Sequence, residues 1–169
     1  MNLDTPLTGR TAWVGLGNLD LGDDAVGLRF GTRLASALPA PHRVYLAGTA
    51  PERYVRELRE ERFDTVVFVD AVDFGAAPGS VAWFASRELA ALYPPVSTHK
   101  IPLPLLARLI SEGARTKVWL LGIQPASLRP GNGLSAIVAA TVDQLAQFFA
   151  SQPGGVHQRA SHPVEAPWP

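Results

Sequence analysis

The chain has 169 residues, of which 47% are hydrophobic and 18% charged, and its 15 basic residues balance its 15 acidic ones. This length suits one domain with a substantial core and is short for two. Balanced charge without a basic run gives no basis for binding nucleic acid or an anionic membrane. The absence of cysteine excludes disulfides, thiol catalysis and thiolate metal sites. Without a signal-peptide pattern or an apolar stretch of membrane-spanning length, we expect a cytoplasmic protein with no membrane partner.

Short β-rich segments alternate with helical patterns along the chain. Strands are predicted near Thr11–Val14, Arg43–Leu46, Thr65–Val69, Ser80–Phe84 and Lys117–Leu121, and helices near 23–38, 50–60, 102–112 and 135–150. This alternation predicts one α/β domain over residues 1–150, a mostly parallel twisted sheet of about five strands with helices on both faces. The fourth strand follows the third after a connection too short for a crossover helix, so we expect it to pair antiparallel.

Two further segments have a local signature. The stretch "TAPE" has the form of a capping box, in which Thr49 caps a helix, Pro51 lies in its first turn and Glu52 comes three residues after the cap. Residues 151–169 are rich in proline, glycine and polar residues without periodicity, which predicts a disordered tail. His157 and His162 lie in that tail without a scaffold, and we assign them no metal site.

The turn after the first strand, "GLGNLDLGDD", looks at first like a nucleotide-binding loop. A dinucleotide fingerprint needs glycine where this chain has Asp20, and no Gly-Lys-Ser/Thr ending of a phosphate loop follows. Two adjacent carboxylates would also repel a phosphate. Asp23 is predicted to cap the following helix, because aspartate is among the best N-caps, and Asp24 would then stand at the first helical position.

Polar residues at the ends of separate predicted strands form a candidate site. Asp24 follows the first strand, Asp70 closes the apolar run "TVVFVD", and His99 stands in "STHK" just before a predicted helix. In open α/β sheets, sites form beyond the carboxyl ends of the strands. Two carboxylates and one imidazole there could bind a borderline divalent cation such as nickel or zinc. A structural role for each residue stays open on these grounds.

Five motifs in order, "GLGNLDLGDDAVG", "GTAPE", "VDAVDFGAAPG", "STHKIPL" and "LGIQP", make residues 11–150 resemble the nickel–iron hydrogenase maturation endopeptidases. The branch that processes the large subunit of hydrogenase 3 is the most similar. The resemblance implies a phosphorylase/hydrolase-like fold and an endopeptidase, aspartic-type by family label. Such an enzyme removes the C-terminal extension of the large-subunit precursor after nickel insertion.

The resemblance also implies the residues of the site. Asp24, Asp70 and His99 match the family's metal ligands and are the catalytic candidates, and the metal is nickel carried by the substrate, although other divalent cations could occupy the site. The implied partner is the hydrogenase large-subunit precursor, and we expect a monomer. Leu46 departs from the family, which commonly has aspartate there. This departure suggests an alternative, a cleavage-deficient protein that binds or escorts the nickel-containing precursor. A generic metal-dependent hydrolase of small molecules is a third reading.

Overall fold

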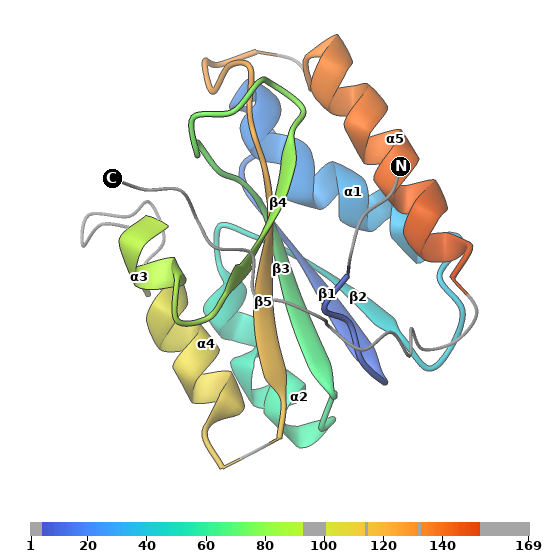
Figure 1. Ribbon diagram of the computed structural model, residues 1–169, viewed down its shortest axis with the longest axis vertical. Coiled ribbons are helices and arrows are strands. Elements are labelled where there is room, and N and C mark those ends of the chain that lie inside the picture. The colour runs from blue at the N-terminus through green and yellow to red at the C-terminus, as the bar shows by residue number, and fades with distance from the viewer. Residues whose placement is uncertain (1–4, 93–100, 114, 132, 153–169) are drawn as a thin grey trace.

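The structure is a computed structural model that describes residues 5–92, 101–113, 115–131 and 133–152 (Figure 1). Its centre is a five-stranded sheet in the order β2-β1-β3-β5-β4. The first four strands in this order run parallel, and β4 pairs antiparallel with β5. The strands are β1 (Thr11–Leu16), β2 (Arg43–Gly48), β3 (Thr65–Ala71), β4 (Val81–Ala85) and β5 (Lys117–Ile123). The predicted α/β class and the antiparallel fourth strand are therefore confirmed.

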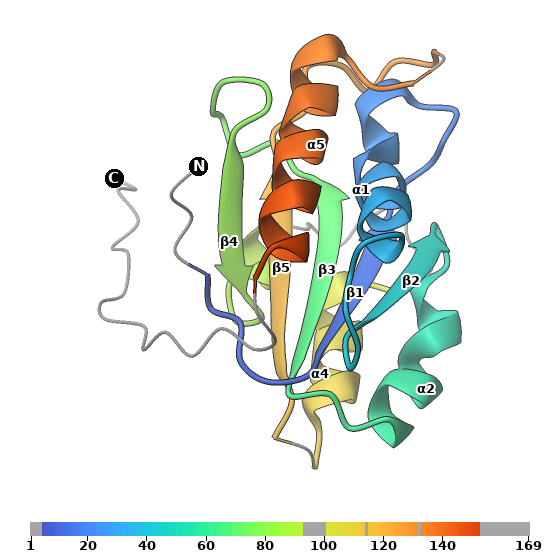
Figure 2. The same ribbon diagram turned by 90° about the vertical axis from the view of Figure 1, so that its right-hand side faces the viewer.

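Helices cover both faces of this sheet, as Figures 1 and 2 show. On one face, α1 (Val26–Ala35) and α5 (Ala136–Ala150) pack over a core that includes Trp13 and Val67. On the other, α2 (Val55–Glu60), α3 (Leu89–Leu92) and α4 (Leu103–Ser111) pack over a core that includes Phe68. Two 3-10 turns, η1 (Gly22–Ala25) and η2 (Pro51–Tyr54), lead into α1 and α2. No helix in these described ranges is long and apolar enough to cross a membrane.

Periodicity in the sequence matches the buried faces of the helices. In α5, the predicted apolar stripe of Val138, Val142, Leu145 and Phe149 is buried. Such a stripe contributes roughly 1.5–3 kcal/mol of transfer free energy for each large side chain removed from water. The helix ends at Ala150, and residues 153–169, the greater part of the predicted tail, lie outside the described residues.

The end of β3 and the cap before α2 differ from what the sequence predicts. Parallel pairing carries β3 past Val69, because Asp70 aligns with Gly122 and Ala71 with Ile123 on β5. The capping-box prediction at Thr49 is wrong, since η2 begins at Pro51 and its N-cap is Ala50, without a side-chain cap. Gly48 takes a φ of 58°, and the N–H of Ala50 donates to the carbonyl of Ala47. This backbone turn leaves Thr49 one residue too early to cap.

Two glycines allow α1 to lie directly on the sheet. A Cβ atom added to Gly27 would lie 2.0 Å from the carbonyl oxygen of Val69 and 2.6 Å from the backbone of Leu16. A Cβ atom added to Gly15 would lie 2.3 Å from the carbonyl oxygen of Gly27. All of these are backbone atoms, on β1, β3 and α1, that cannot rotate away. Only glycine therefore permits the start of α1 to approach the ends of both strands this closely.

Replacing Gly27 by alanine should lower the free energy of unfolding by about 3 kcal/mol or more, because the new methyl group meets fixed backbone on β1 and β3. Gly31→Ala is a matched control, one turn along the same helix. Its methyl group would meet the end of the exposed Leu46 side chain at 2.7 Å, which can move aside. We expect a change within about 1 kcal/mol for the control, since alanine also favours the helix. Urea unfolding midpoints of both variants measure the difference; equal midpoints would contradict the argument.

Candidate active site

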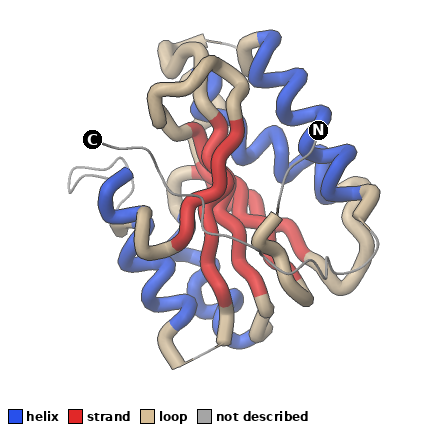
Figure 3. Tube along the Cα trace, viewed as in Figure 1, coloured by secondary structure: helices blue, strands red, loops and turns tan. Residues whose placement is uncertain are grey.

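The carboxyl ends of the parallel strands meet at one edge of the sheet, where β1 and β3 are neighbours. From β1 the chain passes through α1 to β2 on one side, and β3 leads to β4 and β5 on the other. The connections thus diverge between β1 and β3, which is the topological switch point where α/β sheets bind ligands. Figure 3 shows the loops that follow β3 and β5 gathered at this end of the molecule.

Asp24 lies in η1, between the end of β1 and the start of α1. Its Oδ2 accepts a hydrogen bond of 2.7 Å from the backbone N–H of Asn18, which lies two residues beyond β1. Gly17 has a φ of 110°, and a Cβ atom there would overlap the carbonyl oxygen of Asp24. A glycine is required at this point so that the turn can close with Asp24 beside the strand end. Asp24 as a whole residue is half-buried.

Asp70 is the penultimate residue of β3 and is 4% exposed. Its Oδ1 accepts a hydrogen bond of 2.9 Å from the N–H of Ala71. Because side chains alternate along a strand, Asp70 belongs to the α4 face together with Phe68, whereas Val69 belongs to the α1 face. The fold therefore carries the two predicted carboxylates to the ends of the adjacent strands β1 and β3.

His99 lies outside the described residues, so its place relative to the two carboxylates stays a prediction. Within the described ranges, no three histidine, aspartate or glutamate side chains gather as a group that could hold a metal ion. The helix that His99 was predicted to precede is α4, which begins at Leu103 with Pro102 as its N-cap.

Asp23 is not the helix cap that the sequence predicts. The N-cap of η1 is Leu21, without a side-chain hydrogen bond, and Asp23 is 1% exposed. The Asp23 carboxylate instead accepts hydrogen bonds from the backbone N–H groups of Ala126, Ser127 and Ser135 at 2.8, 3.1 and 2.7 Å. The hydroxyl of Ser135 donates a fourth, at 3.0 Å. No local signal could have revealed this role, because the partners lie more than a hundred residues along the chain.

These contacts also set the protonation of Asp23. Burial by itself would raise its pKa, but the hydrogen bonds from Ser135, Ala126 and Ser127 outweigh that effect and lower the pKa from its ordinary value of 3.8. Ser135 is the N-cap residue of α5, so the ionised carboxylate also lies at the favourable, positive end of that helix dipole. Asp23 thereby joins the turn that carries Asp24 to the loop before α5.

Gln124, which lies in the motif "LGIQP" but was given no role from the sequence, fixes a second loop at this edge. Its Oε1 accepts from the N–H groups of Phe74 and Ala76 at 2.9 and 3.2 Å, and its Nε2 donates to Asp73 at 3.0 Å. The hydrogen bonds from Gln124 and Gly75 lower the pKa of Asp73. Gln124 therefore holds the connection between β3 and β4 against the end of β5.

Leu46, the residue that departs from the family pattern, lies on the edge strand β2 and is 47% exposed. Its Cδ2 lies close to Gly31 of α1. Leu46 therefore belongs to the α1 face of the sheet, whereas Asp70 belongs to the α4 face.

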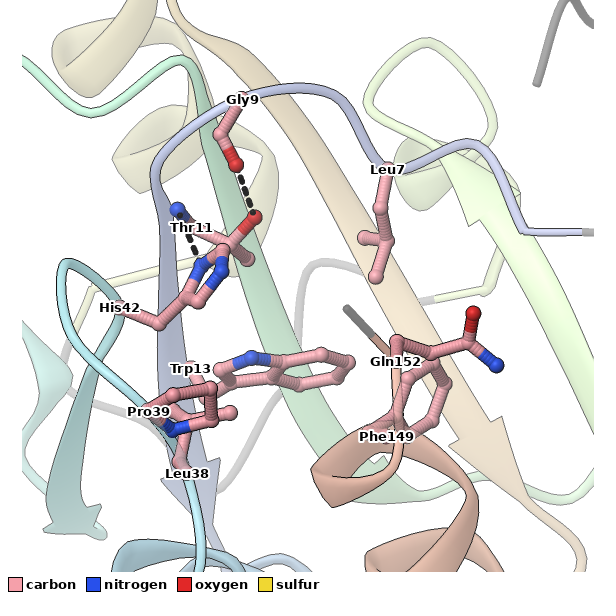
Figure 4. Close-up of a pocket in the computed structure, with 9 residues that line it drawn as sticks. All are labelled: Leu7, Gly9, Thr11, Trp13, Leu38, Pro39, His42, Phe149 and Gln152. Carbon is pink, nitrogen blue, oxygen red and sulfur yellow. Dashed lines mark hydrogen bonds between the residues drawn. The ribbon is translucent and has the colours of Figure 1, made fainter. Parts of the chain in front are cut away.

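A small apolar pocket lies at the opposite end of the sheet, around the start of β1 (Figure 4). It has about 30 Å³, room for roughly one water molecule, and Trp13 and Phe149 form part of its wall. The N–H of Thr11 donates to Nδ1 of His42 at 3.1 Å, and burial lowers the pKa of His42 below its ordinary 6.5. This neutral histidine therefore has a structural role, away from the two carboxylates.

Comparison with known proteins finds relatives among the hydrogenase maturation proteases. The sequence profile of the hydrogenase maturation protease family matches residues 30–152. The hydrogenase 3 maturation protease of Escherichia coli K12 is 33% identical over 110 residues, which cover 65% of this chain and 69% of that protein.

Solved structures agree with the sequence comparison. The [NiFe] hydrogenase maturation protease HycI from Thermococcus kodakarensis superposes with a TM-score of 0.75 at 33% identity, covering 86% of this chain and 92% of its own. The hydrogenase maturating endopeptidase HybD from Escherichia coli superposes with a TM-score of 0.70 at 28% identity, covering 82% and 88%. The likeness thus extends over most of both chains.

Replacing Asp23 by alanine should lower the free energy of unfolding by roughly 2–4 kcal/mol, because three backbone N–H groups lose their acceptor. Since folding lowers the pKa of Asp23, its contribution is complete above the unfolded value near 3.8 and is lost as the pH falls through the folded value. The D23A variant should therefore lose less stability on acidification than the wild type. Urea midpoints between about pH 7 and pH 2.5 test this.

Ser127→Ala is the matched control for Asp23. It removes an exposed hydroxyl that accepts from the N–H of Arg129 at 3.3 Å in the same loop, and should change the unfolding free energy by less than about 0.5 kcal/mol. A stability loss in D23A no larger than that in S127A would show that the buried carboxylate does not hold the loop.

Proposed function

Because the chain belongs to the hydrogenase maturation protease family, we propose that it is the endopeptidase that removes the C-terminal extension of a nickel–iron hydrogenase large-subunit precursor. In this proposal the partner is that precursor after nickel insertion, and the enzyme acts as a cytoplasmic monomer. The observation that carries the proposal is the pair Asp24 and Asp70, which the fold holds at the ends of the neighbouring strands β1 and β3.

In this proposal, nickel is part of the substrate. Asp24, Asp70 and His99 offer two carboxylates and one imidazole, a donor set that suits a borderline divalent cation. Three protein ligands leave coordination positions for groups of the precursor. An enzyme that recognises a metal already held by its substrate needs such positions. The half-buried Asp24 supports this role, since it is ordered by the N–H of Asn18 at the rim of the sheet.

Two routes of hydrolysis fit these residues. In one, the carbonyl of the scissile bond is polarised by the substrate's nickel and attacked by water. In the other, the carboxylate of Asp24 or Asp70 accepts the proton of the attacking water. The aspartic-type label of the family corresponds to the second route.

The escort alternative depends on Leu46. The relatives of this chain are named as proteases, which does not favour a protein that only binds the precursor. Leu46 also lies on the α1 face of the edge strand and not on the α4 face, to which Asp70 belongs. Cleavage of a nickel-loaded precursor would separate the two functions.

We expect the protein to cleave nickel-loaded precursor and to leave nickel-free precursor and a short peptide spanning the scissile bond uncut. The physical reason is that recognition requires the metal in addition to the peptide sequence. The three substrates are compared side by side at equal concentration, with the released C-terminal peptide identified by mass spectrometry. Equal cleavage of all three would indicate an ordinary sequence-specific protease, and binding of loaded precursor without cleavage would favour the escort.

Asp24→Asn, Asp70→Asn and His99→Ala should each reduce cleavage of loaded precursor by at least about a hundredfold, because each removes a metal donor or a proton acceptor. Urea midpoints establish that the variants are folded. Thr49→Ala serves as the control, since this exposed residue at the same edge of the sheet does not cap η2 and should leave cleavage unchanged. Full activity in all three site variants would place the reaction elsewhere.

A further inference from the structure

The large hydrophobic side chains that the described part of the chain exposes are not spread evenly over its surface. They are Leu19, Leu46, Leu105, Leu128 and Ile137, which are 45–52% exposed. Leu19 and Leu128 stand in the loops after β1 and β5, and Leu46 lies two residues before the end of β2. Leu105 and Ile137 are in the first turns of α4 and α5. The helix α5 starts at the carboxyl edge, directly after the loop that follows β5, so its first turn lies at this end as well (Figures 1 and 2).

The opposite end of the sheet has a different character. There, the side chain of Arg10 pairs with Glu61 at 2.6 Å, and Arg43 pairs with Glu57 and Glu61 at 3.7 and 3.1 Å. Single exposed apolar residues are ordinary, whereas apolar side chains that gather on neighbouring loops mark an interaction surface. At the end that carries Asp24 and Asp70, the two loops with Leu19 and Leu128 are the ones to consider.

Backbone contacts join the two loops that carry Leu19 and Leu128. The N–H of Gly131 donates to the carbonyl of Asp20 at 3.2 Å, and the N–H of Asp23 donates to the carbonyl of Ser127 at 3.0 Å. Leu21 and Gly131 also form an isolated parallel bridge. The two leucines are thus presented by a single assembly of ordered backbone. Such preorganisation reduces the entropy that binding must overcome.

We propose that Leu19 and Leu128 form an apolar rim that docks the large-subunit precursor through an apolar surface beside its nickel site. This inference rests on the proposed function and adds the surface that recognises the substrate. Exposed Asp20 and Arg129 flank the rim, which gives it the apolar centre and polar margin of a protein interface. A second copy of this chain is a poorer occupant, because it would cover the turn that carries Asp24.

The test compares the wild type with L19S/L128S and with L19M/L128M, the matched control that keeps an apolar side chain at both positions. Binding of uncleaved, nickel-loaded precursor is titrated first, and cleavage kinetics follow. We expect L19S/L128S to weaken binding and raise KM by about tenfold or more with little change in kcat, because the rim contributes to docking and not to hydrolysis. L19M/L128M should remain close to the wild type.

Several results would overturn the proposal that the rim docks the precursor. These are unchanged binding in L19S/L128S, a fall in kcat at constant KM, or an equal loss in the methionine variant. Sedimentation of the enzyme alone provides a further test, since a wild-type dimer that L19S/L128S dissociates would assign the surface to a second copy. If the wild type binds precursor but does not cleave it, the proposed function fails while the binding titration still decides the docking inference.

Discussion

The buried carboxylate of Asp23 is the interaction on which the arrangement of the active edge depends. It accepts four hydrogen bonds from residues 126, 127 and 135, and so joins the first turn of the fold to the last loop. A charged group that is 1% exposed is tolerated only when its lone pairs are satisfied in this way. The neighbouring Asp24 then has a fixed backbone, and its carboxylate accepts the N–H of Asn18 at the end of β1.

Glycine contacts fix the same turn from the side of the sheet. Gly15 and Gly27 bring the backbone of α1 against β1 and β3, and Gly17 allows the chain to turn sharply at the end of β1. Phosphate-binding loops use glycines for the same steric reason, which is why this turn looks like one in the sequence. Two adjacent aspartates would repel a phosphate, so the loop does not bind one; a cation there belongs to the proposed function. Asp23 holds the turn to the loop before α5, whereas Asp24 lies at the rim of the sheet.

The different roles of Asp23 and Asp24 bear on how a maturation protease could select its substrate. An enzyme with a tight metal site of its own would bind free ions, whereas a site with few protein ligands needs further contacts from the protein that carries the metal. The apolar side chains around the carboxyl edge could provide such contacts, and the loops that carry Leu19 and Leu128 are tied directly to the backbone around Asp23. Recognition of the metal and recognition of the surrounding protein surface would then occur at one end of the fold.

Much of the fold could be predicted from the sequence, because it depends on local periodicity. Alternating strands and helices, the stripe on α5 and the short connection before β4 indicated the mixed sheet. The positions of Asp24 after β1 and of Asp70 near the end of β3 also follow from the apolar runs that precede them, while their role in a site stays a prediction. Tertiary structure alone decided where β3 ends, because its last pairs form with β5, fifty-two residues later in the chain. It also decided that Thr49 does not cap a helix and that Asp23 holds a distant loop. The physical reason is that propensity and capping act over three or four neighbouring residues, whereas a buried carboxylate takes its partners from whatever backbone the fold brings to it.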